Sequence, residues 1–187
     1  MLRLAKKVLA SVVIALILEG CFAQTTSNRS LQKVVIIRHA EKPDKGDNLS
    51  CKGFNRSLQL PAVLYAKFKV PDKVFVPSPD NAKSANHLRM LETIVPFAVK
   101  YNLSINSEFN VDDVRNAVEA ILQSRGYVLV VWEHNRIDNL ATALGADAKG
   151  MKWSDDDYDS IWILDFKKGK VAFSADKENL NPANDCR

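Results

Sequence analysis

Histidine and cysteine are scarce in this sequence, with three of each among its 187 residues. None of them has the spacing of a structural zinc site, which excludes a zinc-binding module. No internal repeat and no low-complexity stretch is visible, so the chain is not built from repeated units. The length suits one domain with a sizeable core, and 47% hydrophobic with 26% charged residues is an ordinary globular mixture.

An excess of one charge is nearly absent as well. The formal net charge is +4, and part of it lies in the first 23 residues, where Arg3, Lys6 and Lys7 accompany Glu19. The remaining chain has a net charge of +2. A nearly neutral domain gives no electrostatic reason for nucleic-acid binding, so we expect no nucleic-acid partner.

The N-terminus has the pattern of a targeting segment. Its basic start precedes the apolar run "VLASVVIALIL", which is short for a membrane span and typical of a signal-peptide core. A membrane anchor helix is the alternative. Cleavage after Ala23 in "CFAQ" competes with a lipoprotein box, "LEGC", in which Cys21 would carry the lipid. Glu19 fits that box poorly, so we expect a signal peptide over 1–23 and a linker over 24–32. We then expect a secreted or periplasmic domain over 33–187, with no stable membrane span in the mature form.

The domain keeps two cysteines, Cys51 and Cys186. In an oxidising compartment two such cysteines are expected to pair, and two free thiols are the alternative.

Strand patterns alternate with helical patterns along the domain. Expected strands cover 33–37, 73–78, 103–106, 127–132, 160–166 and 170–175, and the last two resemble a hairpin across "KKGK". Of the four expected helices, the first follows Ser50 as its cap, and the second has Leu88, Leu91, Val95 and Val99 on one buried face. The third begins at Asp112 or Asp113, and the fourth ends at Gly145. This order predicts an α/β fold, a three-layer αβα sandwich whose mainly parallel sheet has helices on both faces and an added antiparallel portion.

Polar residues that could do chemistry follow the expected strands. Arg38 and His39 follow the first strand, Glu133 and His134 follow "YVLVVW", and a helix after Ser78 carries Arg89. In sheets of this kind the ligand site lies at the carboxyl ends of the strands. One strand-end histidine is usually an ordinary polar residue, but two of them with arginines nearby indicate a shared crevice.

The chemistry that these residues suggest is phosphoryl transfer. The planar fork of an arginine matches phosphate oxygens in a bidentate way. A neutral imidazole can attack phosphorus and form a phosphohistidine, while a second imidazole stabilises an equatorial oxygen. Two arginines and two histidines do this without a metal or other cofactor.

Four segments then resemble the histidine phosphatase superfamily, whose fold is phosphoglycerate mutase-like. "IIRHAEKP" resembles its Arg-His-Gly signature, and "LSCKGFNRS" resembles the segment that follows the signature. "VPSP" with "LRMLETIVPFA" resembles its Ser-Pro strand end and the next helix, and "VVWEHNRI" resembles the strand with the second histidine. The four segments occur in family order and span roughly residues 34–145.

The resemblance implies roles for particular residues. It makes His39 the nucleophile, His134 the second active-site histidine, and Arg38 with Arg89 the phosphate clamp. His87 matches no catalytic position and is interpreted as a helix-surface residue. The run from Asp155 to Asp157 is interpreted as a solvated acidic loop rather than a metal site.

One departure from the family concerns the proton donor. Many members have an acid directly after the second histidine, where this chain has Asn135. Glu133 is our first candidate, although strand alternation would turn it to the opposite face unless the chain already curves. The other candidates are Glu41, Glu108 and Asp112.

The sequence therefore predicts a metal-independent phosphatase that hydrolyses small phosphate monoesters through a phosphohistidine. A phospho-ligand binding protein with little turnover and a phosphomutase are the alternatives. Secretion disfavours phosphohistidine as the substrate and favours a scavenging or envelope-sugar phosphatase.

Overall fold

The computed structural model describes residues 30–79, 88–148 and 150–186. The predicted signal peptide, Cys21, residues 24–29 of the predicted linker, and His87 lie outside the described residues. The end of the predicted linker was wrong, because the first strand already begins at Leu31. Within the described ranges, no helix combines the length and the apolar character needed to cross a bilayer.

The described strands form one sheet in the order β3-β2-β4-β1-β5-β6. Their bounds are β1 Leu31–Arg38, β2 Lys73–Phe75, β3 Ile105–Asn106, β4 Gly126–Trp132, β5 Ser160–Lys167 and β6 Lys170–Lys177. The first four strands in chain order pair in parallel, whereas β5 pairs antiparallel with both β1 and β6. The mainly parallel sheet with an antiparallel hairpin is therefore confirmed. β2 ends at Phe75, whereas the predicted strand continued to Ser78.

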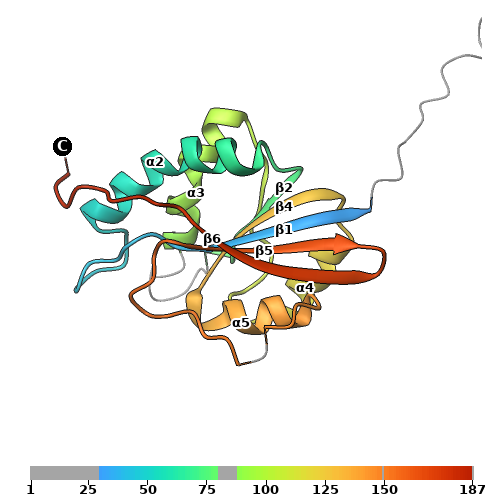
Figure 1. Ribbon diagram of the computed structural model, residues 1–187. Coiled ribbons are helices and arrows are strands. Elements are labelled where there is room, and N and C mark those ends of the chain that lie inside the picture. Colours follow the sequence, from blue (N-terminus) through green and yellow to red (C-terminus); the bar gives the residue numbers. More distant parts are fainter. Residues whose placement is uncertain (1–29, 80–87, 149, 187) are drawn as a thin grey trace, which may run out of the picture.

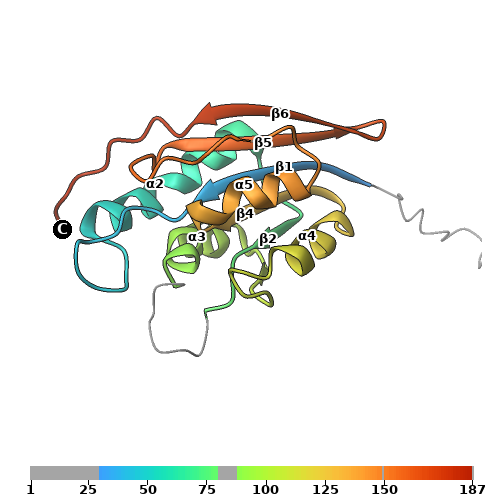
Figure 2. The same ribbon diagram turned by 90° about the horizontal axis from the view of Figure 1, so that it is seen from below.

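Helices cover both faces of this sheet, as Figures 1 and 2 show. Their bounds are α2 Cys51–Phe68, α3 Leu88–Tyr101, α4 Val114–Leu122 and α5 His134–Ala143. One buried cluster joins α2 and α3 to the sheet, and a second joins α4 and α5 to the other face. Successive side chains of β1 alternate between the two clusters, with Val35 and Ile37 in the first and Val34 and Ile36 in the second. This arrangement confirms the predicted three-layer αβα sandwich.

The predicted buried face of α3 was wrong, although the helix itself is confirmed. Val95 and Val99 are 39% and 76% exposed, whereas Met90, Ile94 and Phe97 are fully buried. The residues 90, 94, 97 and 98 also have helical spacing, and this stripe carries more side-chain volume toward the sheet. It also turns Arg89 toward the strand ends.

The start of α2 approaches the chain just after the first strand. The Ser50 hydroxyl caps the helix by accepting from the Gly53 N–H at 3.1 Å, as predicted for a cap at this position. The Ser50 N–H donates to the Glu41 carbonyl at 2.9 Å. A Cβ atom on residue 53 would lie 2.2 Å from that carbonyl oxygen, so only glycine permits this approach.

Cys51 and Cys186 form a disulfide, with their Cα atoms 4.9 Å apart, so the predicted pairing is confirmed. The bond fastens the C-terminal segment to the first turn of α2. Asn55 strengthens the attachment, because its side-chain amide donates to the carbonyls of Ala183 and Asp185 at 3.0 and 2.8 Å.

Candidate active site

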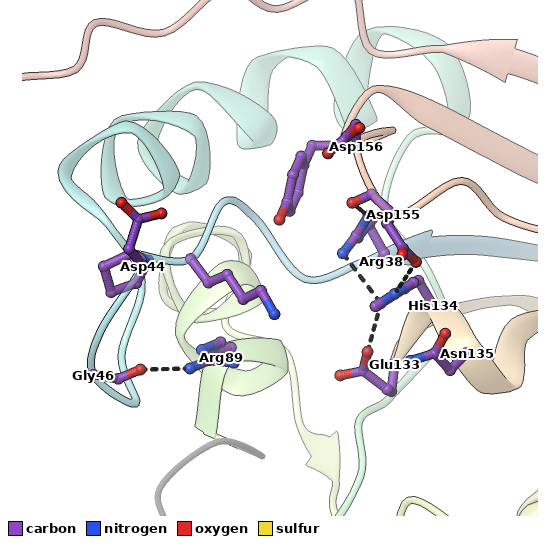
Figure 3. Close-up of a pocket in the computed structure, with 12 residues that line it drawn as sticks. Arg38, Asp44, Gly46, Arg89, Glu133, His134, Asn135, Asp155 and Asp156 are labelled. Atoms are coloured by element: carbon purple, nitrogen blue, oxygen red, sulfur yellow. Dashed lines mark hydrogen bonds and ion pairs between the residues drawn. The ribbon is translucent and has the colours of Figure 1, made fainter.

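The carboxyl ends of β1 and β4 bring the predicted site residues together at one edge of the sheet. Arg38 and Trp132 are register partners in these parallel strands, so the residues that follow them emerge side by side. A polar cavity of about 820 Å³ opens there, and Figure 3 shows Arg38, Arg89, Glu133 and His134 around it.

His39 is almost completely buried, with 1% of its surface exposed. Its Nδ1 lies 2.7 Å from the carbonyl oxygen of Ala40, which can only accept a hydrogen bond. The Nδ1 atom therefore carries a proton, and the lone pair of a neutral imidazole is left on Nε2. The Ala40 N–H donates to the Thr93 hydroxyl at 2.9 Å, and that hydroxyl donates to the Arg89 carbonyl at 2.7 Å. α3 thus fixes the backbone that orients His39.

His134 lies between two carboxylates. Its Nδ1 is 2.5 Å from Glu133 Oε1, and its Nε2 is 3.0 Å from Asp155 Oδ1. Because carboxylate oxygens only accept, an imidazole that donates from both nitrogens satisfies both contacts. Arg38 Nη2 also lies 3.1 Å from Nδ1, but it can donate only to an unprotonated nitrogen. We assign the Nδ1 proton to the Glu133 contact because that distance is the shorter one.

Glu133 connects the two histidines. Its Oε2 lies 3.6 Å from His39 Nε2, while its Oε1 contacts His134. Burial would raise the pKa of this carboxyl, but the hydrogen bond from His134 and the attraction of the neighbouring imidazoles in their protonated forms hold the pKa well below its usual range. The chain turns into α5 at this point, with Glu133 at the N-cap, so strand alternation no longer separates the two side chains.

Arg38 is buried and is held mainly through one of its terminal nitrogens. Its Nη1 donates to the carbonyl oxygens of Ser154, Asp155 and Asp157 at 3.2, 2.7 and 3.3 Å. The Tyr158 ring lies against the guanidinium, 3.9 Å from its central carbon. Burial lowers the pKa of Arg38, although an arginine remains charged at neutral pH.

The Nε–H of Arg38 is buried and has no hydrogen-bond partner among the described residues. Buried donors are satisfied in nearly all native structures, so this group requires an acceptor that the described chain does not supply. Nε and Nη2 form one edge of the guanidinium, the edge that binds two oxygens of one phosphate.

Arg89 lines the same cavity from α3. Its Nη2 donates to the Gly46 carbonyl at 2.7 Å, and its Nε donates to the Asn48 carbonyl at 3.3 Å. The second arginine therefore also supports the loop between β1 and α2, as the dashed line in Figure 3 shows for Gly46.

The other candidate proton donors lie elsewhere. The carboxylate of Glu41 is held by Arg56 at 2.9 Å, and Asp112 is held by Arg136 at 2.8 Å. Glu108 is exposed and does not line the cavity. Asn135 lines it but has no acidic group.

Sequence reasoning missed the contribution of the acidic loop, residues 154–159. Asp155 contacts His134 with its side chain and Arg38 with its carbonyl, so the loop is more than a solvated surface. Asp157 holds the loop in place, because its carboxylate accepts from the backbone N–H groups of Asp159 and Ser160 at 3.0 Å each. Lys42 and Tyr158 also line the cavity and were not predicted. No local pattern identifies these residues, because the fold alone brings them to the strand ends.

His39, Glu133 and His134 each offer a ligand atom, and these atoms lie within 4.8 Å of one another. Two imidazoles and a carboxylate are a ligand set that suits transition metals. The positively charged Arg38 guanidinium lies 3.1 Å from the His134 imidazole and would repel a metal cation bound there. The expectation of metal-independent chemistry stays a prediction.

Comparisons with known proteins support the fold. No family model matches the sequence, and no curated protein matches it significantly. Among solved structures, the protein histidine phosphatase SixA complexed with tungstate matches with a TM-score of 0.55 and 19% identity, over 78% of this chain and 97% of its own. A mycobacterial glucosyl-3-phosphoglycerate phosphatase with inorganic phosphate matches with a TM-score of 0.53 and 15% identity, over 78% and 95% of the two chains.

The alpha-ribazole phosphatase from Shigella flexneri matches with a TM-score of 0.52 and 12% identity, over 82% of this chain and 96% of its own. Identities this low concern the fold alone. The matches agree with the resemblance that the four sequence segments suggested, and they show that this chain has the three-layer fold of the histidine phosphatases.

Proposed function

We propose that the protein is a phosphatase that hydrolyses phosphate monoesters through a phosphohistidine on His39. The observation that carries this proposal is the buried Nε–H of Arg38, which has no partner in the described chain and lies on the same edge of the guanidinium as Nη2. A phosphate bound along that edge would satisfy the orphaned donor. The fold shared with solved phosphatases supports the same conclusion.

The first step transfers the phosphoryl group to the protein. His39 Nε2 attacks phosphorus, the bond from phosphorus to the ester oxygen breaks, and the alcohol leaves with a proton from an acidic side chain. Arg38 and protonated His134 stabilise the equatorial oxygens. In the second step, water attacks phosphorus and gives its proton to the same acidic group. The bond to Nε2 then breaks, and inorganic phosphate leaves.

The structure changes the role that we propose for Glu133. Its lowered pKa keeps it a carboxylate, so we assign it to holding His134 in the donating form and orienting both imidazoles. Asp155 is the better proton donor on geometry, because its side chain is 85% exposed at the mouth of the cavity and can take up a proton from solvent once a phosphoryl oxygen replaces it on His134. The alcohol part of the substrate would lie on that side of the cavity and would leave from there.

A second candidate function, a phospho-ligand binding protein with little turnover, is favoured by one observation. The carboxylate of Asp155 occupies His134 Nε2 at 3.0 Å, where a phosphoryl oxygen would bind. Tight phosphate binding would displace the Asp155 carboxylate from His134. An acid that is then poorly aligned would not assist the attack of water, and the phosphohistidine would not be hydrolysed.

We also propose that the domain works outside the cytoplasm, as a secreted or periplasmic protein or as a lipoprotein through Cys21. The disulfide between Cys51 and Cys186 supports this, because such bonds persist mainly in oxidising compartments.

The function is tested by turnover of the purified full chain against aryl and alkyl phosphate monoesters, compared with His39→Ala and Arg38→Lys. We expect wild-type turnover, loss of several orders of magnitude in His39→Ala, and a strong decrease in Arg38→Lys, which keeps a charge but lacks the fork. Arg115→Lys, an exposed site on α4, is the control. Retained activity in His39→Ala would refute the mechanism. Phosphate binding without turnover in the wild type would favour the binding protein.

A further inference from the structure

The end of the sheet opposite the candidate active site gathers lysines. Lys33 lies near the start of β1, Lys67 and Lys69 lie at the end of α2, and three more lie at the turn between β5 and β6. Figures 1 and 2 place the start of β1 and this turn at the same end of the molecule. We call this surface the basic edge, and it consists of Lys33, Lys67, Lys69, Lys167, Lys168 and Lys170.

Most of this positive charge is not neutralised by ion pairs. Lys33 lies 3.5 Å from Asp165, and Lys67 lies 2.7 Å from Asp176. The other four lysines are exposed and have no carboxylate partner within the described ranges. The domain as a whole is therefore nearly neutral, but the basic edge has a local excess of positive charge.

A groove of about 490 Å³ runs through the basic edge. Phe68, Tyr127 and Phe166 line it, and so do four of the lysines, Lys33, Lys67, Lys69 and Lys167. Gln32 and Asp165 complete the lining, and the Asp165 carboxylate lies 3.5 Å from Lys33. The hydroxyl of Tyr127 is buried and has no hydrogen-bond partner in the described part of the chain. Aromatic walls, an unused hydroxyl and surrounding ammonium groups suit a ligand that has an anionic head and an apolar body.

The opposite end of the molecule has a different charge. Asp44, Asp155 and Asp156 are exposed around the mouth of the candidate active site, where Lys42 is the one exposed cation among the described lining residues. A negatively charged plane would therefore attract the basic edge and repel the rim of the cavity, which fixes one orientation of the domain.

The sequence outside the described residues joins the domain at the basic edge. Residues 1–29 precede Ser30, and they include the apolar run over residues 8–18. A chain that passes through or remains in a membrane by this run would hold the basic edge close to that membrane.

We propose that the basic edge docks on an anionic lipid surface, with phospholipid head groups in the groove and the candidate active site facing away from the membrane. A lysine near an anionic membrane strengthens binding by about fivefold. Docking in this orientation leaves the cavity open to soluble phosphate esters.

The test measures binding of the full chain to vesicles of phosphatidylglycerol with phosphatidylcholine and to vesicles of phosphatidylcholine alone. The readout is the ratio of the two partition coefficients, compared between variants, because the apolar run and the basic residues Arg3, Lys6 and Lys7 are the same in all of them. The variant Lys167→Gln/Lys170→Gln removes two exposed charges from the basic edge. The control Arg115→Gln/Lys152→Gln removes two exposed charges elsewhere.

We expect the wild type and the control to prefer anionic vesicles, and the basic-edge variant to lose about 25-fold of that preference. Salt at about 1 M should abolish the preference, because it shortens the screening length to about 3 Å. Equal losses in both variants would overturn the proposal, because binding would then follow total charge alone. Tight binding to duplex DNA without a preference for anionic vesicles would also overturn it and identify a nucleic-acid surface instead.

Discussion

A buried ion cluster beside the candidate active site predicts an unusual dependence of stability on pH. Arg56 donates to both oxygens of Glu41 at 2.9 Å and to Glu178 at 2.6 Å, and Asp159 lies 3.7 Å from the same guanidinium. Three carboxylates thus share one buried cation, and Lys52 lies 3.9 Å from Glu41. Burial raises the pKa of Glu178 to about 7, and the repulsion of Asp159 and Glu41 adds to this, although Arg56 opposes the shift.

The sign of the effect follows from proton binding. Between the ordinary value of 4.5 and about 7, the folded protein keeps a proton on Glu178 that the unfolded chain releases. Stability from this group is therefore fully present below about pH 4.5 and declines as the pH rises toward 7. A shift of this size corresponds to at most about 3 kcal/mol.

Replacing Glu178 with Gln should remove this decline of stability with rising pH. Gln keeps an oxygen for Arg56 but does not titrate, so the difference in unfolding free energy between wild type and Glu178→Gln should change by up to about 3 kcal/mol between pH 4 and pH 8. Urea unfolding across this range measures it, with Glu119→Gln, an exposed site on α4, as the control. A difference that stays constant with pH would refute the reasoning.

Three further predictions concern the site and its supports. Asp155→Asn should slow alkyl phosphates by about 10²–10⁴ and aryl phosphates far less, whereas Glu133→Gln should slow both classes alike; the reverse pattern in steady-state assays would make Glu133 the proton donor. Thr93→Val should leave the buried Ala40 N–H unpaired, which lowers the unfolding free energy by about 1–3 kcal/mol and slows turnover, and unchanged values in both assays would contradict the role assigned to this hydroxyl. Reduction of the Cys51 disulfide should lower the unfolding free energy by about 2–4 kcal/mol, and thiol titration that finds two free cysteines in unreduced protein would contradict the pairing.

The sequence by itself determined the layers of the fold and the edge that carries the site. Alternating strand and helix patterns predict a parallel sheet covered on both faces, and polar residues after two strands predict where Arg38, His39 and His134 meet. The Ser50 cap and the cysteine pair are also readable, because each depends on residue type and compartment rather than on distant packing.

Only the tertiary structure decided how these side chains are held and which state they adopt. Glu133 has the right position, but its lowered pKa depends on two imidazoles that follow different strands, one after β1 and one at the start of α5. Asp155 reaches His134 from a loop 21 residues away, and the carbonyls that fix Arg38 lie 116 to 119 residues further along the chain. The buried face of α3 was mispredicted for a related reason, since several apolar stripes fit its periodicity and only packing against the sheet selects one. Hydrogen bonds and proton affinities are set within a few ångströms in space, and a linear pattern does not encode those distances.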